Sequence, residues 1–179
     1  MWCVMCCMEN LHVKILDLND KSKPNELNLE FSQSVNLFTD GSGKGKTFVF
    51  EVITRLPKFN KFELFKDSTL SPSDFTVFNT NSLRSLGEIE NCLKTSKVIV
   101  LDDFEYLVNF CRDSGQLGKL YKLLLDSPAI LVIICKRGLE DFGFSDYSIC
   151  NLKISDRKVQ IVRPLENGLE GFLKSDYEL

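Results

Sequence analysis

Histidine is almost absent from this sequence: among 179 residues, His12 is the only one. A Ser-His-Asp or Cys-His hydrolase would therefore depend on a single imidazole near the N-terminus. His12 lies in a stretch of alternating apolar and polar residues, a pattern typical of a β-strand. The scarcity of histidine thus argues against these hydrolases and favours a structural position for His12.

An excess of positive charge and a long apolar run are also missing. Lysine and arginine total 22 against 25 aspartate and glutamate residues, so the formal net charge is −3. This charge does not support a nucleic-acid partner, although a local basic patch stays open. The apolar start, residues 1–8, is too short to cross a membrane and lacks the basic beginning of a signal peptide. We therefore expect no membrane association.

Cysteine, in contrast, is plentiful, with an odd number of residues at irregular spacing. The seven are Cys3, Cys6, Cys7, Cys92, Cys111, Cys135 and Cys150. Several lie in apolar runs, which indicates reduced, mostly buried thiols and predicts a cytoplasmic protein. The first three could bind a metal, but no second Cys or His pair is close enough in sequence to complete four ligands. A loose leader or a first strand is the better interpretation of residues 1–10.

The first third of the chain predicts three β-strands followed by a helix. Alternation predicts strands over 12–18 and 27–31, and a short apolar run predicts a third over 35–39. From Thr47 the apolar residues recur at helical spacing, and we expect Pro57 to end this helix. The strands form a β-rich entry to the rest of the fold.

The remainder of the chain predicts strands that alternate with helices. Residues 58–74 predict a loop, and Ser85 with Glu88 matches a capping box at the start of a helix over 85–95. The other expected elements are a strand over 75–78, a helical stretch over 106–126 broken at 113–115, and closing strands over 147–154 and 158–162, with a hairpin around 155–157 as one arrangement.

Two continuous apolar runs, 98–101 and 129–135, are typical of strands covered on both faces. Together with the helices between them they predict an α/β fold with a mostly parallel central sheet and helices on both faces. A chain of 179 residues suits one core. We therefore expect a single domain over 1–179, with a peripheral tail at 165–179.

A glycine-rich segment lies between the strand over 35–39 and the helix that follows. Its residues are Asp40, Gly41, Ser42, Gly43, Lys44, Gly45, Lys46 and Thr47. Amide groups at a helix N-terminus favour a bound phosphate, and glycines let the backbone approach it closely. Lys46 would reach the β- and γ-phosphates, and Thr47 would offer its hydroxyl to Mg²⁺. The segment therefore predicts a site for ATP or GTP.

The segment departs from the usual Gly-x-x-x-x-Gly-Lys-Ser/Thr pattern at its first position. Asp40 stands where the pattern has glycine, while Gly45, Lys46 and Thr47 match it. The Asp40 carboxylate would weaken phosphate binding unless it points away. A register shifted by two residues fails, because Gly45 would then occupy the hydroxyl position. A flexible turn without a ligand is the alternative interpretation, and the strand–loop–helix context argues against it.

Two carboxylates follow the apolar run over 98–101. Asp102 is expected to hold Mg²⁺, because a hard cation prefers oxygen ligands. In the P-loop ATPases, which the Gly-Lys-Thr loop resembles, a glutamate that polarises the attacking water often stands at the position of Asp103, and Glu105 is a second candidate for this role. The shorter reach of an aspartate predicts slow hydrolysis. A pair of solvated acids in a strand-to-helix loop is the alternative interpretation.

Two cations follow the second apolar run. Lys136 and Arg137 come directly after the strand over 129–135. Either side chain could neutralise charge on the γ-phosphate during its transfer. A basic surface loop explains the same residues, and the sequence does not decide between the two interpretations.

The Gly-Lys-Thr loop and the Leu101-Asp102-Asp103 strand end resemble the P-loop ATPases of the additional-strand type, the group that holds the AAA+, RecA-like and ABC-like families. The resemblance covers roughly residues 27–155. It implies a three-layer α/β/α sandwich with ATP and Mg²⁺ as ligands. The ABC signature is missing before Asp102, and the chain after the last strand is too short for the lid of a full AAA+ motor. The small size resembles short ATP-binding proteins of bacterial mobile elements and phages.

The resemblance implies an ATPase that passes a conformational change to a protein partner, a nucleic-acid complex or a second copy of the chain. GTP is less expected, since Glu105 replaces the glycine of the GTPase Asp-x-x-Gly pattern. A module that binds ATP without hydrolysing it stays open. A small-molecule kinase is weaker, because 58–74 offers three lysines and no arginine for a lid.

Overall fold

An antiparallel sheet forms the N-terminal part of the fold. The computed structural model describes residues 9–16, 26–31, 35–39, 46–135 and 159–162. Strands β1 (Glu9–Ile15), β2 (Glu26–Phe31) and β4 (Phe62–Leu64) pair in the order β2-β1-β4. The alternating apolar residues of β1 and β2 are all buried, so the predicted β-rich entry is confirmed. β4 lies in the segment that we expected to be a loop. The sequence does not predict this strand, because it has only three residues and two of them are exposed.

A five-stranded parallel sheet forms the centre of the molecule. It contains β3 (Val35–Thr39), β5 (Phe75–Asn79), β6 (Val98–Asp102), β7 (Ile130–Cys135) and β8 (Val159–Val162). The strand order is β5-β6-β7-β3-β8, and every neighbouring pair is parallel. The predicted parallel sheet is thus confirmed. The expected strand over 147–154 and the hairpin turn at 155–157 lie outside the described residues.

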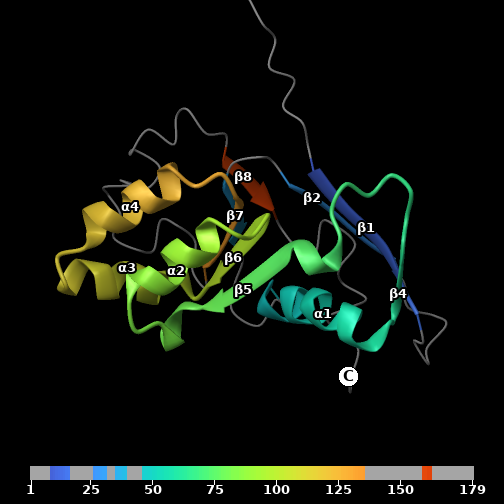
Figure 1. The fold of residues 1–179 in the computed structure, drawn as a ribbon, viewed down its shortest axis with the longest axis horizontal. Coiled ribbons are helices and arrows are strands. Elements are labelled where there is room, and N and C mark those ends of the chain that lie inside the picture. Colours follow the sequence, from blue (N-terminus) through green and yellow to red (C-terminus); the bar gives the residue numbers. More distant parts are fainter. Residues whose placement is uncertain (1–8, 17–25, 32–34, 40–45, 136–158, 163–179) are drawn as a thin grey trace, which may run out of the picture.

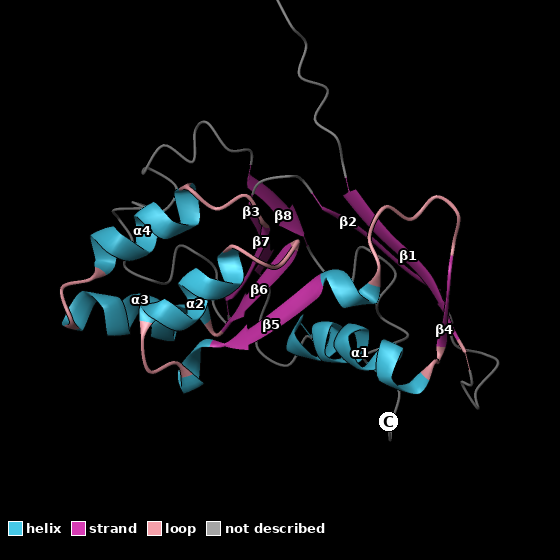
Figure 2. Cartoon of the chain, viewed as in Figure 1, coloured by secondary structure: helices cyan, strands magenta, loops and turns pink. Residues whose placement is uncertain are grey.

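Four helices connect these strands in the described part of the chain (Figure 2). They are α1 (Lys46–Phe59), α2 (Leu86–Leu93), α3 (Phe104–Asp113) and α4 (Leu117–Leu125), with short 3₁₀ turns η1 (Pro72–Asp74) and η2 (Thr80–Ser82). The predicted break at 113–115 separates α3 from α4. Within the described residues, no helix is long and apolar enough to span a membrane.

Two details at helix ends differ from the predictions. Pro57 does not end α1, which continues to Phe59. Because Pro57 lies in the last turn, its missing N–H removes only one helical hydrogen bond there. The capping box at α2 does not form: Ser85 makes no side-chain cap bond, and Glu88 Oε1 instead accepts from the Arg84 amide at 3.3 Å.

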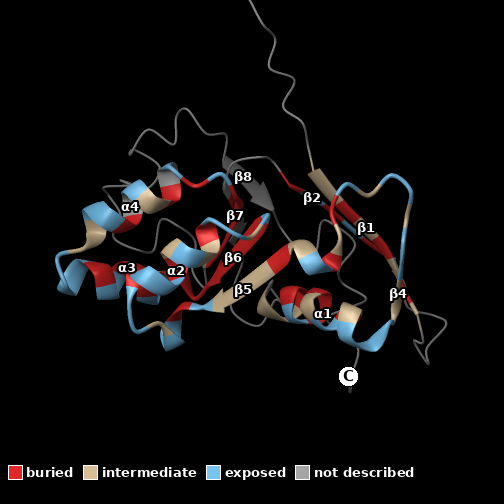
Figure 3. Cartoon of the chain, in the orientation of Figure 1, coloured by how far each residue is buried: buried red, intermediate tan, exposed pale blue. Residues whose placement is uncertain are grey.

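Both faces of the parallel sheet are covered (Figure 1). Alternate residues of β6 and β7 belong to two separate apolar clusters. Val98 and Val100 share one cluster with α1 and the antiparallel sheet, whereas Ile99 and Leu101 share the other with α2, α3 and α4. Figure 3 shows β6 buried along its whole length. The helix α1 therefore lies on one face of the sheet and the other three helices on the opposite face.

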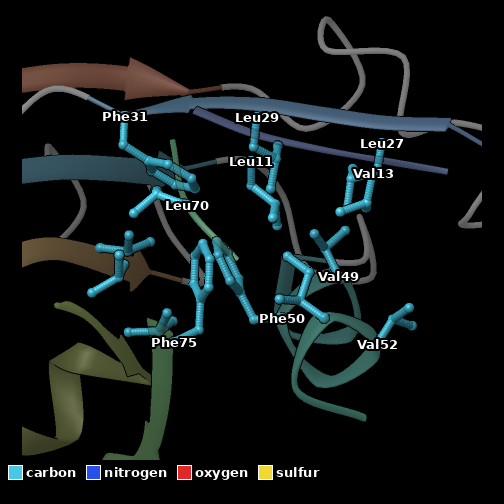
Figure 4. Close-up of a cluster of buried hydrophobic side chains, with 14 of the residues drawn as sticks. Leu11, Val13, Leu27, Leu29, Phe31, Val49, Phe50, Val52, Leu70 and Phe75 are labelled. Carbon is cyan, nitrogen blue, oxygen red and sulfur yellow. The ribbon is translucent and has the colours of Figure 1, made fainter. Parts of the chain in front are cut away.

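Aromatic side chains join α1 to both sheets (Figure 4). Phe50 from α1 is fully buried, and its ring centroid lies 6.2 Å from that of Phe75 in β5. Phe31 from β2 meets the same Phe75 ring edge-on at 5.6 Å. This packing fixes α1 between the antiparallel and the parallel sheet, and so fixes the position of its N-terminus.

The prediction of buried thiols is confirmed for one of the two cysteines whose side chains the structure describes. Cys111 is buried and Cys92 is half-buried, and both are free. Desolvation by burial raises the pKa of the Cys111 thiol above its ordinary value of 9.0. A raised pKa keeps this thiol protonated and unreactive near neutral pH.

A glycine in the left-handed region ends α3. Gly115 has φ +69°, the Gln116 amide donates to the Cys111 carbonyl at 2.7 Å, and the Gly115 amide donates to the Arg112 carbonyl at 3.1 Å. This is the hydrogen-bond pattern of a Schellman motif. The turn redirects the chain into α4.

We expect Gly115→Ala to lower the free energy of unfolding by about 1 to 2 kcal/mol, because a Cβ disfavours the left-handed conformation. Gly118→Ala is the matched control, since Gly118 lies inside α4 with open space around its Cα. Gly118→Ala should raise the free energy of unfolding by about 0.5 to 1 kcal/mol, because alanine has a higher helix propensity than glycine. Urea unfolding should show that Gly115→Ala is destabilised and Gly118→Ala is stabilised. Equal changes in stability would contradict the need for a left-handed glycine at position 115.

Candidate functional site

The carboxyl ends of the central strands lie level with one another. Thr39 of β3 pairs with Cys135 of β7, and Leu101 of β6 pairs with Ile133, so β3, β6 and β7 end within about one residue of the same height. β7 lies between β3 and β6. At the usual strand spacing, the ends of β3 and β6 are therefore roughly 10 Å apart. The glycine-rich segment and Asp102 consequently start from the same edge of the sheet.

Asp102 is the last residue of β6 and is only 3% exposed. Side chains alternate along a strand, so Asp102 faces the same side of the sheet as Val98 and Val100, which is the side that α1 covers. Its Oδ1 accepts a hydrogen bond from the Asp103 amide at 2.9 Å. The carboxylate thus lies at the sheet edge, on the face from which α1 begins.

Asp103 adopts the left-handed conformation, with φ 55° and ψ 40°, at the residue before α3. Thr80 Oγ1 donates to its carbonyl oxygen at 2.6 Å, and Asn81 Nδ2 donates to its Oδ2 at 2.6 Å. The Tyr106 amide also donates to the Asp103 carbonyl, at 2.9 Å. Thr80 and Asn81 belong to η2, directly after β5. They hold Asp103 on the β5 side of β6, opposite to the side where β7 and β3 lie.

Glu105 lies in the first turn of α3, where a negative charge is favourable to the helix dipole. Its Oε2 is buried and has no hydrogen-bond partner among the described residues. A buried acceptor without a partner is costly, because the group has left water without replacement. Glu105 is therefore placed beside Asp103 with unused hydrogen-bonding capacity.

The structure places only part of the predicted phosphate loop. Residues 40–45 lie outside the described residues, as do Lys136 and Arg137. Lys46 is the first residue of α1, and Thr47 follows it with a half-buried side chain. Of the predicted site residues, the structure therefore describes the side chains of Thr47, Asp102, Asp103 and Glu105, and the last three are close neighbours in the sequence.

Sequence reasoning did not single out Thr80 and Asn81. The available signal is the polar run Asn79-Thr80-Asn81-Ser82 directly after the strand over 75–78. Because parallel strands end at one edge, polar residues after a strand next to β6 belong near Asp103. That reasoning requires the neighbour relation between β5 and β6, which the sequence does not contain.

Among the described residues, no group of three or more His, Cys, Asp and Glu side chains is arranged to hold a metal ion. A Mg²⁺ ion at Asp102 would therefore draw its other ligands from Thr47, water and a bound phosphate, which is the way Mg²⁺ is usually bound with a nucleotide. No protein-family model matches this sequence, and no similar curated protein was found.

Proposed function

We propose that this protein is a P-loop ATP-binding domain that binds Mg·ATP at the carboxyl edge of its parallel sheet and hydrolyses it slowly. The observation that supports this most is the strand order. β3, which leads into the glycine-rich segment, and β6, which ends in Asp102, are separated by the single strand β7. In this proposal, α1 on one face of the parallel sheet and α2–α4 on the other would be the outer layers of a three-layer P-loop sandwich.

The residues before and at the start of α1 would bind the phosphates. α1 is 14 residues long, and its first amides lack carbonyl partners within the helix. These amides and the helix dipole favour an anion. In this proposal the backbone of residues 40–45 surrounds the β- and γ-phosphates, and the Lys46 ammonium neutralises part of their charge. ATP is preferred over GTP on the sequence pattern around Glu105.

Asp102 and Thr47 fit a bound Mg²⁺ ion. Both offer oxygen atoms, and Asp102 is a buried carboxylate on the α1 side of the sheet. A buried carboxylate is stabilised by a nearby positive charge, which a divalent cation supplies. When bound with the nucleotide, Mg²⁺ would neutralise phosphate charge and orient the γ-phosphate.

We expect Asp102→Asn to weaken the Mg²⁺-dependent part of ATP affinity by about 10- to 100-fold, a loss at least as large as that seen when residues that orient a metal's ligands are replaced. Calorimetric titrations with a non-hydrolysable ATP analogue, with and without Mg²⁺, measure this dependence. Asp113→Asn, at the exposed C-terminal end of α3, is the matched control and should not change it. If ATP affinity depends on Mg²⁺ equally in Asp102→Asn and in wild type, Asp102 does not contribute to the proposed Mg²⁺ site.

Hydrolysis would require a carboxylate that accepts a proton from water, and Asp103 and Glu105 are the candidates. Lys136 and Arg137 stay candidates for neutralising the γ-phosphate. The hydrogen bond from Asn81 to Asp103 favours slow turnover, and it also favours the second candidate function, an ATP-dependent interaction module that does not hydrolyse ATP. In either case the conformational change would be passed to a protein partner or a second copy.

Phosphate release from wild type and from Asp103→Asn separates these two functions. An ATPase releases phosphate at a measurable rate that falls in Asp103→Asn or Glu105→Gln, whereas an interaction module releases none from either protein while still binding ATP. Phosphate transfer that appears only with an added small-molecule acceptor would support the kinase alternative instead.

A further inference from the structure

The connection between α1 and β4 presents large apolar side chains to solvent. Phe59, the last residue of α1, is 46% exposed, and Leu64, the last residue of β4, is 45% exposed. Among the described residues, the other exposed large apolar side chains are Tyr106 and Phe110, both on α3. Figure 1 shows β4 and the end of α1 at one end of the molecule and α3 at the other. The two exposed pairs are therefore separate surfaces.

The turn after α1 is held by its backbone. Asn60 adopts the left-handed conformation, with φ 49°, which asparagine tolerates better than most residues. The Lys61 amide donates to the Leu56 carbonyl at 3.4 Å, the bond that closes a Schellman motif. The Leu16 amide donates to the Lys61 carbonyl at 2.8 Å, which ties the turn to the end of β1. The exposure of Phe59 thus results from a defined turn.

Phe59 and Leu64 lie on the same side of the antiparallel sheet. Leu64 pairs with Val13, and Val13 belongs to the buried cluster that includes α1. Side chains opposite each other in a strand pair face the same way, so Leu64 faces the α1 side. Glu63 faces the other side, because side chains alternate along β4. The exposed apolar surface is therefore kept apart from the carboxylate between its two residues.

Cations surround this apolar surface. Residues 55–66, which we call the basic turn, contain one carboxylate and four cations, namely Arg55, Lys58, Lys61 and Lys66, although the whole chain has a net charge of −3. Lys61 Nζ lies 6.0 Å from the centroid of the Phe59 ring. Lys58 and Lys66 are exposed, and neither forms an ion pair within the described part of the chain. The basic turn is thus a local positive surface on an acidic protein.

The chemistry of the basic turn distinguishes between kinds of partner. Exposed Phe and Leu side chains among lysines are typical of segments that lie in the headgroup region of a membrane. Lysine is depleted in the cores of protein–protein interfaces, which disfavours a protein partner. Single-stranded nucleic acids are bound by stacking on aromatic rings, and Leu64 offers no ring. An anionic lipid surface therefore fits the basic turn best, because it accepts both the apolar side chains and the cations.

We propose that the basic turn binds the surface of a membrane that contains anionic phospholipid. Phe59 and Leu64 enter the headgroup region, and the lysines contact lipid phosphates. The sequence-based expectation of no membrane association rested on the lack of a spanning segment and of a signal peptide, neither of which surface binding needs. The inference does not depend on the proposed function, because Lys46 and Phe59 are the two opposite ends of α1.

Sedimentation with lipid vesicles, without nucleotide, tests this proposal. We expect the full chain to bind vesicles of equal parts phosphatidylglycerol and phosphatidylcholine, and not vesicles of phosphatidylcholine alone. Phe59→Ala should weaken binding about fivefold, because about half of the ring is available for burial. Lys58→Ala should weaken it by a similar factor of about five, the value expected for one cation near an anionic membrane. Added salt should weaken binding further.

Matched controls come from the opposite face of the parallel sheet. Phe110→Ala removes an aromatic ring that is 39% exposed on α3, and Lys119→Ala removes an exposed cation on α4. Neither should change vesicle binding. Urea unfolding of Phe59→Ala should match wild type closely, so that a loss of vesicle binding is not explained by unfolding.

Several results would overturn the inference. These are no binding of wild type to the anionic vesicles, equal binding to both kinds of vesicle, or equal losses in Phe59→Ala and Phe110→Ala. Binding of a single-stranded oligonucleotide that Phe59→Ala weakens, without vesicle binding, would assign the basic turn to nucleic acid instead. A dimer that dissociates in Phe59→Ala, again without vesicle binding, would assign it to a second copy. Failure to bind ATP would overturn only the proposed function.

Discussion

Replacing Lys46 by alanine is expected to lower the affinity for Mg·ATP by about 100-fold, because each hydrogen bond to a charged group contributes about 1.5 to 3 kcal/mol. Lys46 is the first residue of α1, next to the helix N-terminus that would bind the phosphates. Calorimetric titration with a non-hydrolysable analogue measures the loss directly.

Lys58→Ala is the control for this prediction. Lys58 lies in the last turn of the same helix and is exposed, so its removal changes the net charge equally without touching the proposed site. Its affinity should stay within about twofold of wild type, because distant exposed charges are screened by salt. A similar loss in both variants would show that general charge, and not the position of Lys46, controls binding.

Phe50→Ala should have the largest effect on stability. Phe50 is fully buried between the antiparallel sheet and β5, and it contacts the Phe75 ring. Its removal leaves a large cavity, which typically costs about 3 to 5 kcal/mol. Urea unfolding measures the change. Because Phe50 fixes α1 against both sheets, weaker nucleotide binding should accompany the loss of stability.

Phe59→Ala is the control on the same helix. The Phe59 side chain is 46% exposed, so its truncation removes little buried area and should change stability by about 0.5 kcal/mol or less. Equal destabilisation by the two variants would contradict the observed packing of α1 and would place Phe59 in a buried contact.

Much of the local structure could be predicted from the sequence because the patterns are strong. The alternation of Leu27, Leu29 and Phe31 corresponds to the buried face of β2, and the continuous apolar run before Asp102 corresponds to a strand buried on both faces. The break between α3 and α4 was visible as well, because Gly115 is the residue that suits a left-handed turn.

The arrangement of the elements could not be predicted in the same way. The order β5-β6-β7-β3-β8 results from packing between distant segments, and no local pattern states that β7 inserts between β3 and β6. β4 was missed because its three residues gain their strand conformation only from pairing with β1.

The candidate site was likewise predictable from the sequence only in part. The position of Asp102 at the end of a buried strand followed from sequence, because a carboxylate after four apolar residues marks the strand end. The attachment of Asp103 to Asn81 did not, since it joins residues 22 positions apart through the neighbour relation of β5 and β6. The predicted phosphate loop itself lies mostly outside the described residues, so its role stays a prediction.

A titration of the full chain with a non-hydrolysable ATP analogue and Mg²⁺ tests the central proposal most directly. The proposal predicts saturable heat at one nucleotide per chain, a higher melting temperature with the ligand, and loss of both in Lys46→Ala. If the wild-type protein gives neither heat nor a change in melting temperature with any Mg-nucleotide, the carboxyl edge of this sheet does not bind nucleotides and the proposal is wrong.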